Sequence, residues 1–209
     1  MCECDECCGC FGVYRPFALG FCIGVAILAA VAVIVVLLLG YGRVRHLSID
    51  VEDASLARFE LATTSPATAV AYNLTLTLAV RNRNWAMGAT FRSLEADYRF
   101  DGQRFDRVAV VASYALPARK TAVFRLVSGD DGALVELGSA GVKEYRKEKR
   151  EGVFDIEVGL SGEVRYQLHR TWCRLEAKCP LRLQLRPEDG AEVFQKTTCD
   201  VLKSSQRGC

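Results

Sequence analysis

The chain has 209 residues, of which 50% are hydrophobic, and its 27 Lys plus Arg nearly balance its 25 Asp plus Glu. A formal net charge of +2 gives no global field that would favour nucleic acid as a partner, and the length suits one domain with appendages. The ten cysteines are uneven, because six precede residue 23 and the other four follow residue 172. This split predicts two compartments or two uses for the thiols.

The chain begins MCECDECCGC, and we interpret residues 1–16 as a cysteine-rich tail. Thiols beside a membrane span are typical sites of reversible palmitoylation, which takes place on the cytosolic side. The candidate acceptors are Cys4, Cys7, Cys8 and Cys10. Two alternatives stay open: a soft metal ion bound by the thiolates, although the two separated Cys pairs of a structural zinc site are missing, and no specific role.

Residues 17–41 read FALGFCIGVAILAAVAVIVVLLLGY and contain no charged side chain. A helix of this length reaches roughly 37 Å, which exceeds the ~30 Å hydrocarbon core of a bilayer. A cleaved signal peptide needs a basic start and a shorter apolar stretch, whereas this start is acidic and cysteine-rich. We therefore predict a retained transmembrane helix over a buried core helix. Gly20 and Gly24 have the GxxxG spacing, which chance explains in a span rich in small residues.

The orientation of the span follows from two opposing observations. Arg15 precedes the span, whereas Arg43, Arg45 and Arg58 follow it, and the charge rule then favours a cytosolic C-terminal side. Against this, Asn73-Leu74-Thr75 is an N-glycosylation sequon, and the tail has the cysteines expected of a cytosolic segment. We give these two features more weight and predict the tail inside and residues 42–209 outside the cell.

The segment after the span shows the period-2 alternation of half-buried strands. In 70–81, for example, the apolar Val70, Tyr72 and Leu74 alternate with Ala71, Asn73 and other small or polar residues. The other alternating rows are 94–100, 105–111, 122–126, 154–160, 164–168, 181–186 and 193–201. Seven or eight short strands with one wet face predict two packed antiparallel sheets.

One segment of this region departs from the strand pattern. Residues 131–150 have helical apolar spacing and many mixed charges, which predicts a short helix or an ordered loop with a solvated face. The alternative for these charges is a basic docking patch.

Two late cysteines are candidates for a disulfide. Cys179 lies in the inward row with Leu181, and Cys199 lies in the last predicted strand. If those strands are neighbours, a bridge closing about 20 residues would contribute roughly 3 kcal/mol in the chain-entropy model. The alternative is two buried free thiols. Cys173 and Cys209 have no obvious partners, and a second bridge is open to them.

Outside the cysteine-rich tail, the sequence offers no candidates for catalytic or metal-binding chemistry. Of the two histidines, His46 borders the membrane and His169 is predicted to point outward. Phosphate-binding glycine motifs and a GxSxG nucleophile elbow do not occur. We therefore expect no enzyme activity, no cofactor and no metal.

Several segments together resemble one plant family. A cysteine-containing tail and one span precede YNLTLTLAVRNRN and SLEADYRFDGQRF, and the pair Cys179 and Cys199 follows. This arrangement is similar to the NHL proteins (non-race-specific disease-resistance and harpin-induced-like membrane proteins), whose outer part is a late embryogenesis abundant group 2 domain. The family's Asn-Pro-Asn turn appears as Asn82, Arg83 and Asn84, and the missing proline predicts a looser turn.

The resemblance implies an immunoglobulin- or fibronectin-III-like β-sandwich after the transmembrane helix. It also implies a plasma-membrane or plasmodesmal location and a non-enzymatic role in plant defence or stress. We expect a cell-surface adhesion or signalling component with a cell-wall or protein partner. The alternative is a stress-protective, lipid-associated protein of an internal membrane.

Overall fold

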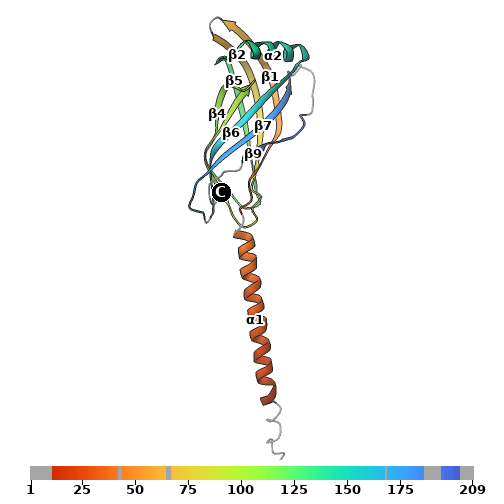
Figure 1. Ribbon diagram of the computed structural model, residues 1–209, viewed down its shortest axis with the longest axis vertical. Helices are drawn as coiled ribbons and strands as arrows, with labels where there is room; N and C mark the ends of the chain where they lie inside the picture. The colour runs from red at the N-terminus through yellow and green to blue at the C-terminus, as the bar shows by residue number, and fades with distance from the viewer. Residues whose placement is uncertain (1–10, 42–43, 65–66, 168, 186–193, 203–209) are drawn as a thin grey trace, which may run out of the picture. The chain divides into compact units, whose positions relative to one another are not determined.

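The computed structural model describes residues 11–41, 44–64, 67–167, 169–185 and 194–202. The chain forms two compact units, Met1–Arg43 and Val44–Cys209. The first unit contains one helix, and the second contains all the strands (Figure 1).

The first unit is the helix α1, Phe11–Tyr41, which begins six residues before the predicted span. Within it, Gly20–Leu39 is long and apolar enough to cross a membrane, by length and composition, and its side chains are exposed. A helix that is apolar on every side needs an apolar environment around it, which a bilayer supplies. The apolar helix predicted from the sequence is thus present.

The second unit is a sandwich of two antiparallel sheets, as predicted. One sheet has the strand order β5-β2-β1-β8, and the other has the order β4-β3-β6-β7-β9. The strands are β1 (Ser48–Thr64), β2 (Ala67–Arg81), β3 (Ala89–Phe100), β4 (Gln103–Leu116), β5 (Thr121–Val135), β6 (Val153–Tyr166), β7 (Cys173–Gln184), β8 (Thr197–Thr198) and β9 (Asp200–Leu202). The helix α2, Ser139–Glu151, lies between β5 and β6.

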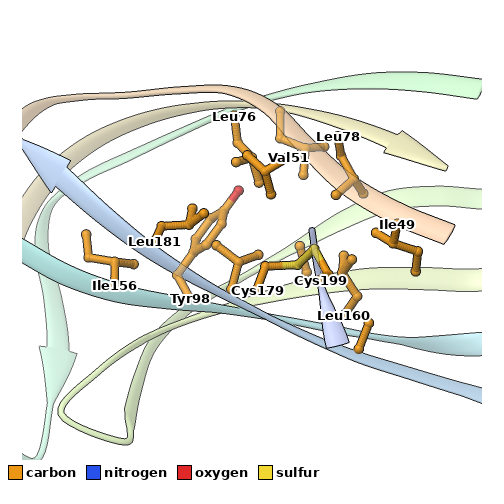
Figure 2. Close-up of a cluster of buried hydrophobic side chains, with 14 of the residues drawn as sticks. Ile49, Val51, Leu76, Leu78, Tyr98, Ile156, Leu160, Cys179, Leu181 and Cys199 are labelled. Atoms are coloured by element: carbon orange, nitrogen blue, oxygen red, sulfur yellow. A yellow bond between two sulfur atoms is a disulfide. The ribbon is translucent and has the colours of Figure 1, made fainter. Parts of the chain in front are cut away.

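The inward rows of both sheets form one hydrophobic core. The apolar residues that alternate along 70–80 are all at most 3% exposed, which confirms the inward face predicted for β2. Figure 2 shows Leu76, Leu78 and Val51 facing Tyr98, Ile156 and Leu181 from the opposite sheet. The Tyr98 hydroxyl is buried and has no hydrogen-bond partner among the described residues. Burial, followed by the charge of Asp106, raises the pKa of Tyr98 to about 12.

The predicted last strand is wrong in one respect, because it is two short strands in different sheets. Thr197–Thr198 pairs with β1, whereas Asp200–Leu202 pairs with β7. Cys199 lies between them, and its backbone N–H donates to the carbonyl of Ile49 in β1 (2.9 Å). Period-2 alternation cannot reveal this change of sheet, because the side chains of both pieces still alternate across it.

Asp101 and Gly102 form the turn between β3 and β4, and both residues have positive φ (48° and 74°). The like charges Arg99 and Arg104 face each other across this hairpin. The buried Asp97 carboxylate offsets their repulsion, since Nη atoms of both arginines lie within 3.8 Å of it. Arg107 Nε also donates to Asp97 Oδ1 (2.7 Å). The pairing of β3 with β4 shifts register after Tyr98, so that Tyr98 lies opposite Asp106.

The helix α2 has the solvated face of mixed charges that the sequence predicted, but it begins at Ser139, because residues 131–135 belong to β5. The side chain of Tyr145 attaches this helix to β1, because the Leu61 N–H donates to its hydroxyl (3.1 Å), which itself donates to the Phe59 carbonyl (3.3 Å). Rings of Phe59, Phe100 and Phe154 surround Tyr145. The helix ends at Gly152, whose φ of 73° suits a residue without Cβ.

Candidate functional site

The sequon asparagine Asn73 lies in the middle of β2 and is exposed. In the sheet it is flanked by Arg58 of β1 and Gly129 of β5. Gly129 has no side chain to cover the Asn73 amide, and Arg58 is drawn away into ion pairs with Glu60 and Asp131 (both 2.8 Å). The structure thus leaves open space over the amide to which a glycan would be attached.

The asparagines of the family motif form a buried hydrogen-bond network where β2 ends. Asn82 is 0% and Asn84 is 1% exposed. The Asn82 Nδ2 group donates to the carbonyls of Met87 (2.9 Å) and Pro117 (3.2 Å). Its Oδ1 atom accepts from the backbone and side-chain amides of Asn84 (both 3.0 Å). One side chain therefore connects the β2–β3 loop with the β4–β5 loop.

Asn84 extends this network to the point where the chain enters the domain. The Arg45 backbone N–H donates to Asn84 Oδ1 (2.6 Å), and Asn84 Nδ2 donates to the Arg45 carbonyl (2.8 Å). Backbone bonds from Asn82 N–H to the Lys120 carbonyl (2.9 Å) and from Arg119 N–H to the Asn84 carbonyl (3.0 Å) complete the arrangement. The sequence predicted only a turn at this motif. In the structure, the side-chain amides of Asn82 and Asn84 join three segments: the entry to the domain, the β2–β3 loop and the β4–β5 loop.

The middle residue of the motif, Arg83, is exposed. Because the flanking amides hold the turn, the loss of proline at this position leaves the network intact. The looser turn predicted from the missing proline stays a prediction.

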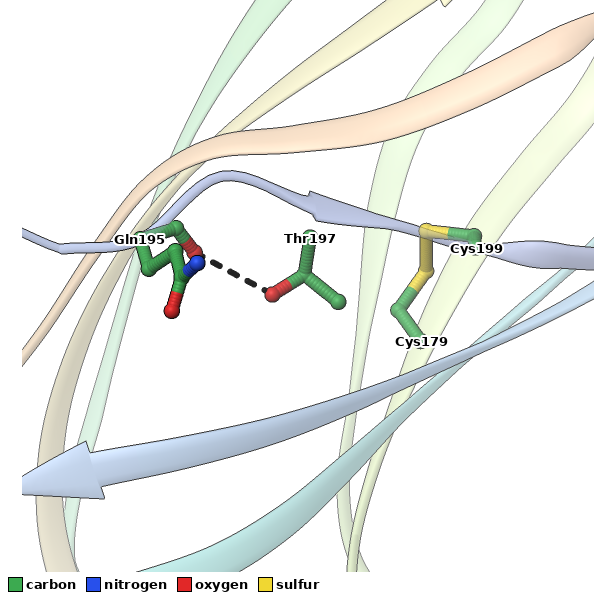
Figure 3. The surroundings of a disulfide bond; sticks show 4 residues. All are labelled: Cys179, Gln195, Thr197 and Cys199. Carbon is green, nitrogen blue, oxygen red and sulfur yellow. Dashed lines mark hydrogen bonds between the residues drawn. A yellow bond between two sulfur atoms is a disulfide. The ribbon is translucent and has the colours of Figure 1, made fainter.

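Cys179 and Cys199 form a disulfide between β7 and the segment that changes sheet (Figure 3). Both residues are buried, at 0% and 5% exposure. Close to the bond, the Thr197 hydroxyl donates to the Gln195 carbonyl (3.2 Å), which shapes the approach to β8. Since Cys199 is bonded to β1 through its backbone and to β7 through its side chain, it links the two sheets.

The remaining cysteines are in three situations. Cys22 is an exposed free thiol in α1. Cys173 is buried and is not a free thiol. The palmitoylation candidates Cys4, Cys7, Cys8 and Cys10, and also Cys2 and Cys209, lie outside the described residues.

A second polar cluster joins the two sheets inside the sandwich. The hydroxyls of Tyr72 (β2) and Ser128 (β5) both donate to Oδ2 of Asp106 (β4), the latter at 2.6 Å, and they lie 2.7 Å from each other. Burial, reinforced by the hydrogen bond to Asp106, raises the pKa of Tyr72. The phenol therefore stays protonated and stabilises the fold as a donor.

The possible metal ligands among the described residues are dispersed over the domain. Among them there is no set of three His, Cys, Asp or Glu side chains that could bind a metal ion. His46 is exposed, and His169 lies in the loop after β6 ends at Tyr166, not on the strand predicted for it. The candidate functional features are therefore the exposed sequon at Asn73, the loops joined by Asn82 and Asn84, and the Cys179–Cys199 disulfide.

Glu148 on α2 is a buried carboxyl group whose ionisation affects stability. Its Oε2 atom accepts from the Asp155 backbone N–H (3.2 Å). Burial raises the pKa of Glu148 to about 7, and the neighbouring Asp155 and Glu144 carboxylates add to the shift, while Lys147 opposes it. The folded state therefore binds this proton more tightly than the unfolded chain does.

We expect the free energy of unfolding to fall by about 2–3 kcal/mol between pH 4.5 and pH 8 on account of Glu148, because a raised carboxyl pKa favours folding only where the group is protonated. Glu148→Gln should remove this part of the pH dependence and stabilise the protein at pH 8, since the amide oxygen still accepts from Asp155. Urea unfolding at both pH values measures it. Glu151→Gln, an exposed carboxylate on the same helix, serves as the control, and an equal slope in wild type and Glu148→Gln would contradict the assignment.

A scan against family models matches residues 77–184 to the family described as late embryogenesis abundant protein. The match runs from within β2 to the end of β7 and covers just over half of the chain. The chain belongs to the late embryogenesis abundant protein family. The Asn82–Asn84 motif and Cys179 lie inside the part matched to this family, whereas Asn73 and Cys199 lie outside it.

Curated relatives of this family member come from Arabidopsis thaliana. NDR1/HIN1-like protein 10 is 31% identical over 126 residues, which are 60% of this chain and 54% of that protein. NDR1/HIN1-like protein 3 is 27% identical over 86% of this chain and 77% of its own length. NDR1/HIN1-like protein 2 is 26% identical over 72% of this chain and 63% of its own length. The similarity to NHL proteins predicted from the sequence is thus confirmed.

A solved structure of a protein from Archaeoglobus fulgidus covers 66% of this chain and 98% of its own chain at 9% identity. Its TM-score is 0.35, so it supports no argument about this late embryogenesis abundant protein.

Proposed function

We propose that the chain is a single-pass plasma-membrane protein that acts without enzymatic chemistry as a cell-surface adhesion or signalling component in plant defence or stress. In this proposal residues 1–16 are a cytosolic tail acylated at its cysteines, 17–41 span the bilayer and 42–209 lie outside. The similarity to NDR1/HIN1-like proteins supports the role in defence or stress. A cell-wall component or another protein would be the partner.

The observation that carries the external placement is the disulfide inside the domain. Disulfides persist in oxidising compartments and are rare in the cytosol, and the Cys179–Cys199 bond links both sheets of the core. The exposed sequon at Asn73 points the same way. The positive charges after the span favour the opposite orientation, which would suit the lipid-associated protein of an internal membrane, and experiment can separate the two.

We expect Asn73→Gln, expressed in plant cells, to lose a glycosidase-sensitive mass shift that the parent chain shows. Thr75→Ser keeps the sequon and is the matched control, whereas Thr75→Ala destroys it and should behave like Asn73→Gln. Protease added to intact cells should digest the domain. A domain that is protected from the protease, unglycosylated and reduced at Cys179 and Cys199 would refute the external placement and leave the alternative.

A further inference from the structure

Four segments meet at the end of the sandwich opposite α2, where the chain enters the domain. We call residues 44–47, 82–88, 117–120, 167 and 169–172 the entry loops. Hydrogen bonds connect them, from Asn84 to Arg45, from Asn82 to Lys120, and from the Gln167 N–H to the Gly88 carbonyl (2.8 Å). The entry loops thus form one continuous surface built from distant parts of the sequence.

The charge of this surface has one sign. The entry loops contain five exposed cationic side chains and two histidines but no carboxylate. None of the five has an ion pair within the described part of the chain, and they are Arg45, Arg83, Arg119, Lys120 and Arg170. At the other end, residues 101–102 and 136–152 contain five acidic and five basic side chains. A uniform positive charge is therefore specific to the entry loops.

Both tryptophans of the chain lie in the entry loops. Trp85 in the β2–β3 loop is 46% exposed. Trp172, before β7, has the guanidinium groups of Arg92, which is ion-paired with Glu163, and of Arg165 over its ring at 4.5 Å and 4.7 Å from the centroid. Tryptophan beside arginine is typical of the membrane–water interface, where the ring lies at headgroup depth and the cation meets phosphate.

A shallow groove lies over the start of β3, between the end of β4 and the end of β6. Its lining includes Leu116, Pro117, Arg165, Gln167 and His169, so it combines apolar walls with cationic and hydrogen-bonding groups. Such a lining suits a phosphate-containing headgroup above an apolar chain.

The covalent chain limits how far this surface can be from the bilayer. Val44, the first described residue of the domain, follows Tyr41 at the end of α1 by three residues. Three extended residues span at most about 11 Å, whatever the orientation of the domain. The backbone of Arg45 is itself bound to Asn84, so the β2–β3 loop is subject to the same limit.

From this charge, these tryptophans and this short tether, we infer that the entry loops dock on the phospholipid headgroups of the bilayer that contains α1. Lipid phosphates bind the five cations, and Trp85 enters the interface between headgroups and acyl chains. The inference rests on the proposed membrane span, and the docking is strongest on a leaflet that contains anionic lipid.

The test uses the full chain in vesicles of phosphatidylcholine, with or without about one third phosphatidylserine. α1 contains no tryptophan, so emission reports only on Trp85 and Trp172. A nitroxide on the lipid headgroup should quench this emission about twofold more in the anionic vesicles. About 0.5 M NaCl should remove the difference, because it shortens the Debye length to below about 5 Å.

A matched pair of variants separates local charge from net charge. The variant Arg83→Gln/Arg119→Gln/Lys120→Gln/Arg170→Gln should lose the extra quenching. The variant Lys143→Gln/Arg146→Gln/Lys149→Gln/Arg150→Gln removes the same charge from α2 and should keep it. Near-ultraviolet circular dichroism shows whether each variant is folded. Equal effects of the two variants, or quenching that responds to neither lipid charge nor salt, would overturn the inference.

Two further outcomes are informative. Protein stripped from the vesicles by an alkaline wash refutes the span itself, whereas retained protein without the expected quenching refutes only the docking. If soluble polygalacturonate, and not phosphatidylserine, changes the tryptophan emission at low salt, the surface binds acidic polysaccharide and lipid docking is wrong.

Discussion

Asn82→Ala is expected to lower the free energy of unfolding by about 3–5 kcal/mol and the melting temperature by roughly 10 °C. The substitution leaves the carbonyls of Met87 and Pro117 and the amide of Asn84 without their partner in a site closed to water. Each unsatisfied buried polar group costs about 1–3 kcal/mol. Urea unfolding of the full chain in micelles, followed by tryptophan emission, measures the loss, since Trp85 lies in the same loop.

Two variants make this prediction specific. Arg83→Ala, at the exposed centre of the motif, should change stability by no more than about 0.5 kcal/mol. Asn82→Asp keeps the size of the side chain but places an oxygen against the carbonyl oxygens that Nδ2 now reaches, so it should be as damaging as alanine. A melting temperature within about 2 °C of wild type for both Asn82 variants would show that the network contributes little.

Cys179→Ala/Cys199→Ala is expected to cost about 3 kcal/mol, because the bond closes a loop with a sequence separation of 20. Alanine leaves no unpaired polar atom in the core, so the double variant isolates the constraint. The loss should appear as a lower urea midpoint, with the pairing of β9 to β7 the first to open in hydrogen exchange. Reduction of the wild type should lower the midpoint at least as much, because the reductant also reaches the disulfide of Cys173.

Cys22→Ser is the control, since this thiol is free and lies in α1, and it should leave the unfolding of the domain unchanged. A double variant as stable as the wild type would show that the Cys179–Cys199 bond contributes little to the stability of the domain.

The sequence predicted those parts of the fold that depend only on the alternation of apolar and polar residues within one strand. The apolar rows of β2, β3 and β6 were assigned correctly, because each side chain faces inward or outward by a rule that acts within one strand. The change of sheet at Cys199 and the register shift after Tyr98 could not be predicted, because both depend on which strand lies alongside. The resemblance pointed to Asn82 and Asn84, but their bonds to Arg45 and Pro117 require the folded chain.

The clustering of charge in the entry loops was even harder to predict from the sequence. Arg45, Arg83, Arg119 and Arg170 are far apart in sequence, and a net charge of +2 for the whole chain conceals their gathering. The indication available in the sequence was that the turns after 81, 116 and 166 contain basic residues and both tryptophans but no acid. In an antiparallel sandwich every second connection along the chain lies at the same end. The order and direction of the strands would therefore have been enough to predict that these turns lie together.

The position of β8 and β9 has a consequence for biosynthesis. Each is an edge strand, one in either sheet, and both come from residues 197–202. While the nascent chain is still being made, neither layer of the sandwich is complete and the thiol of Cys179 has no mate. A product terminated before Thr197 would therefore reach the quality-control machinery with two open sheet edges and a reactive sulfur.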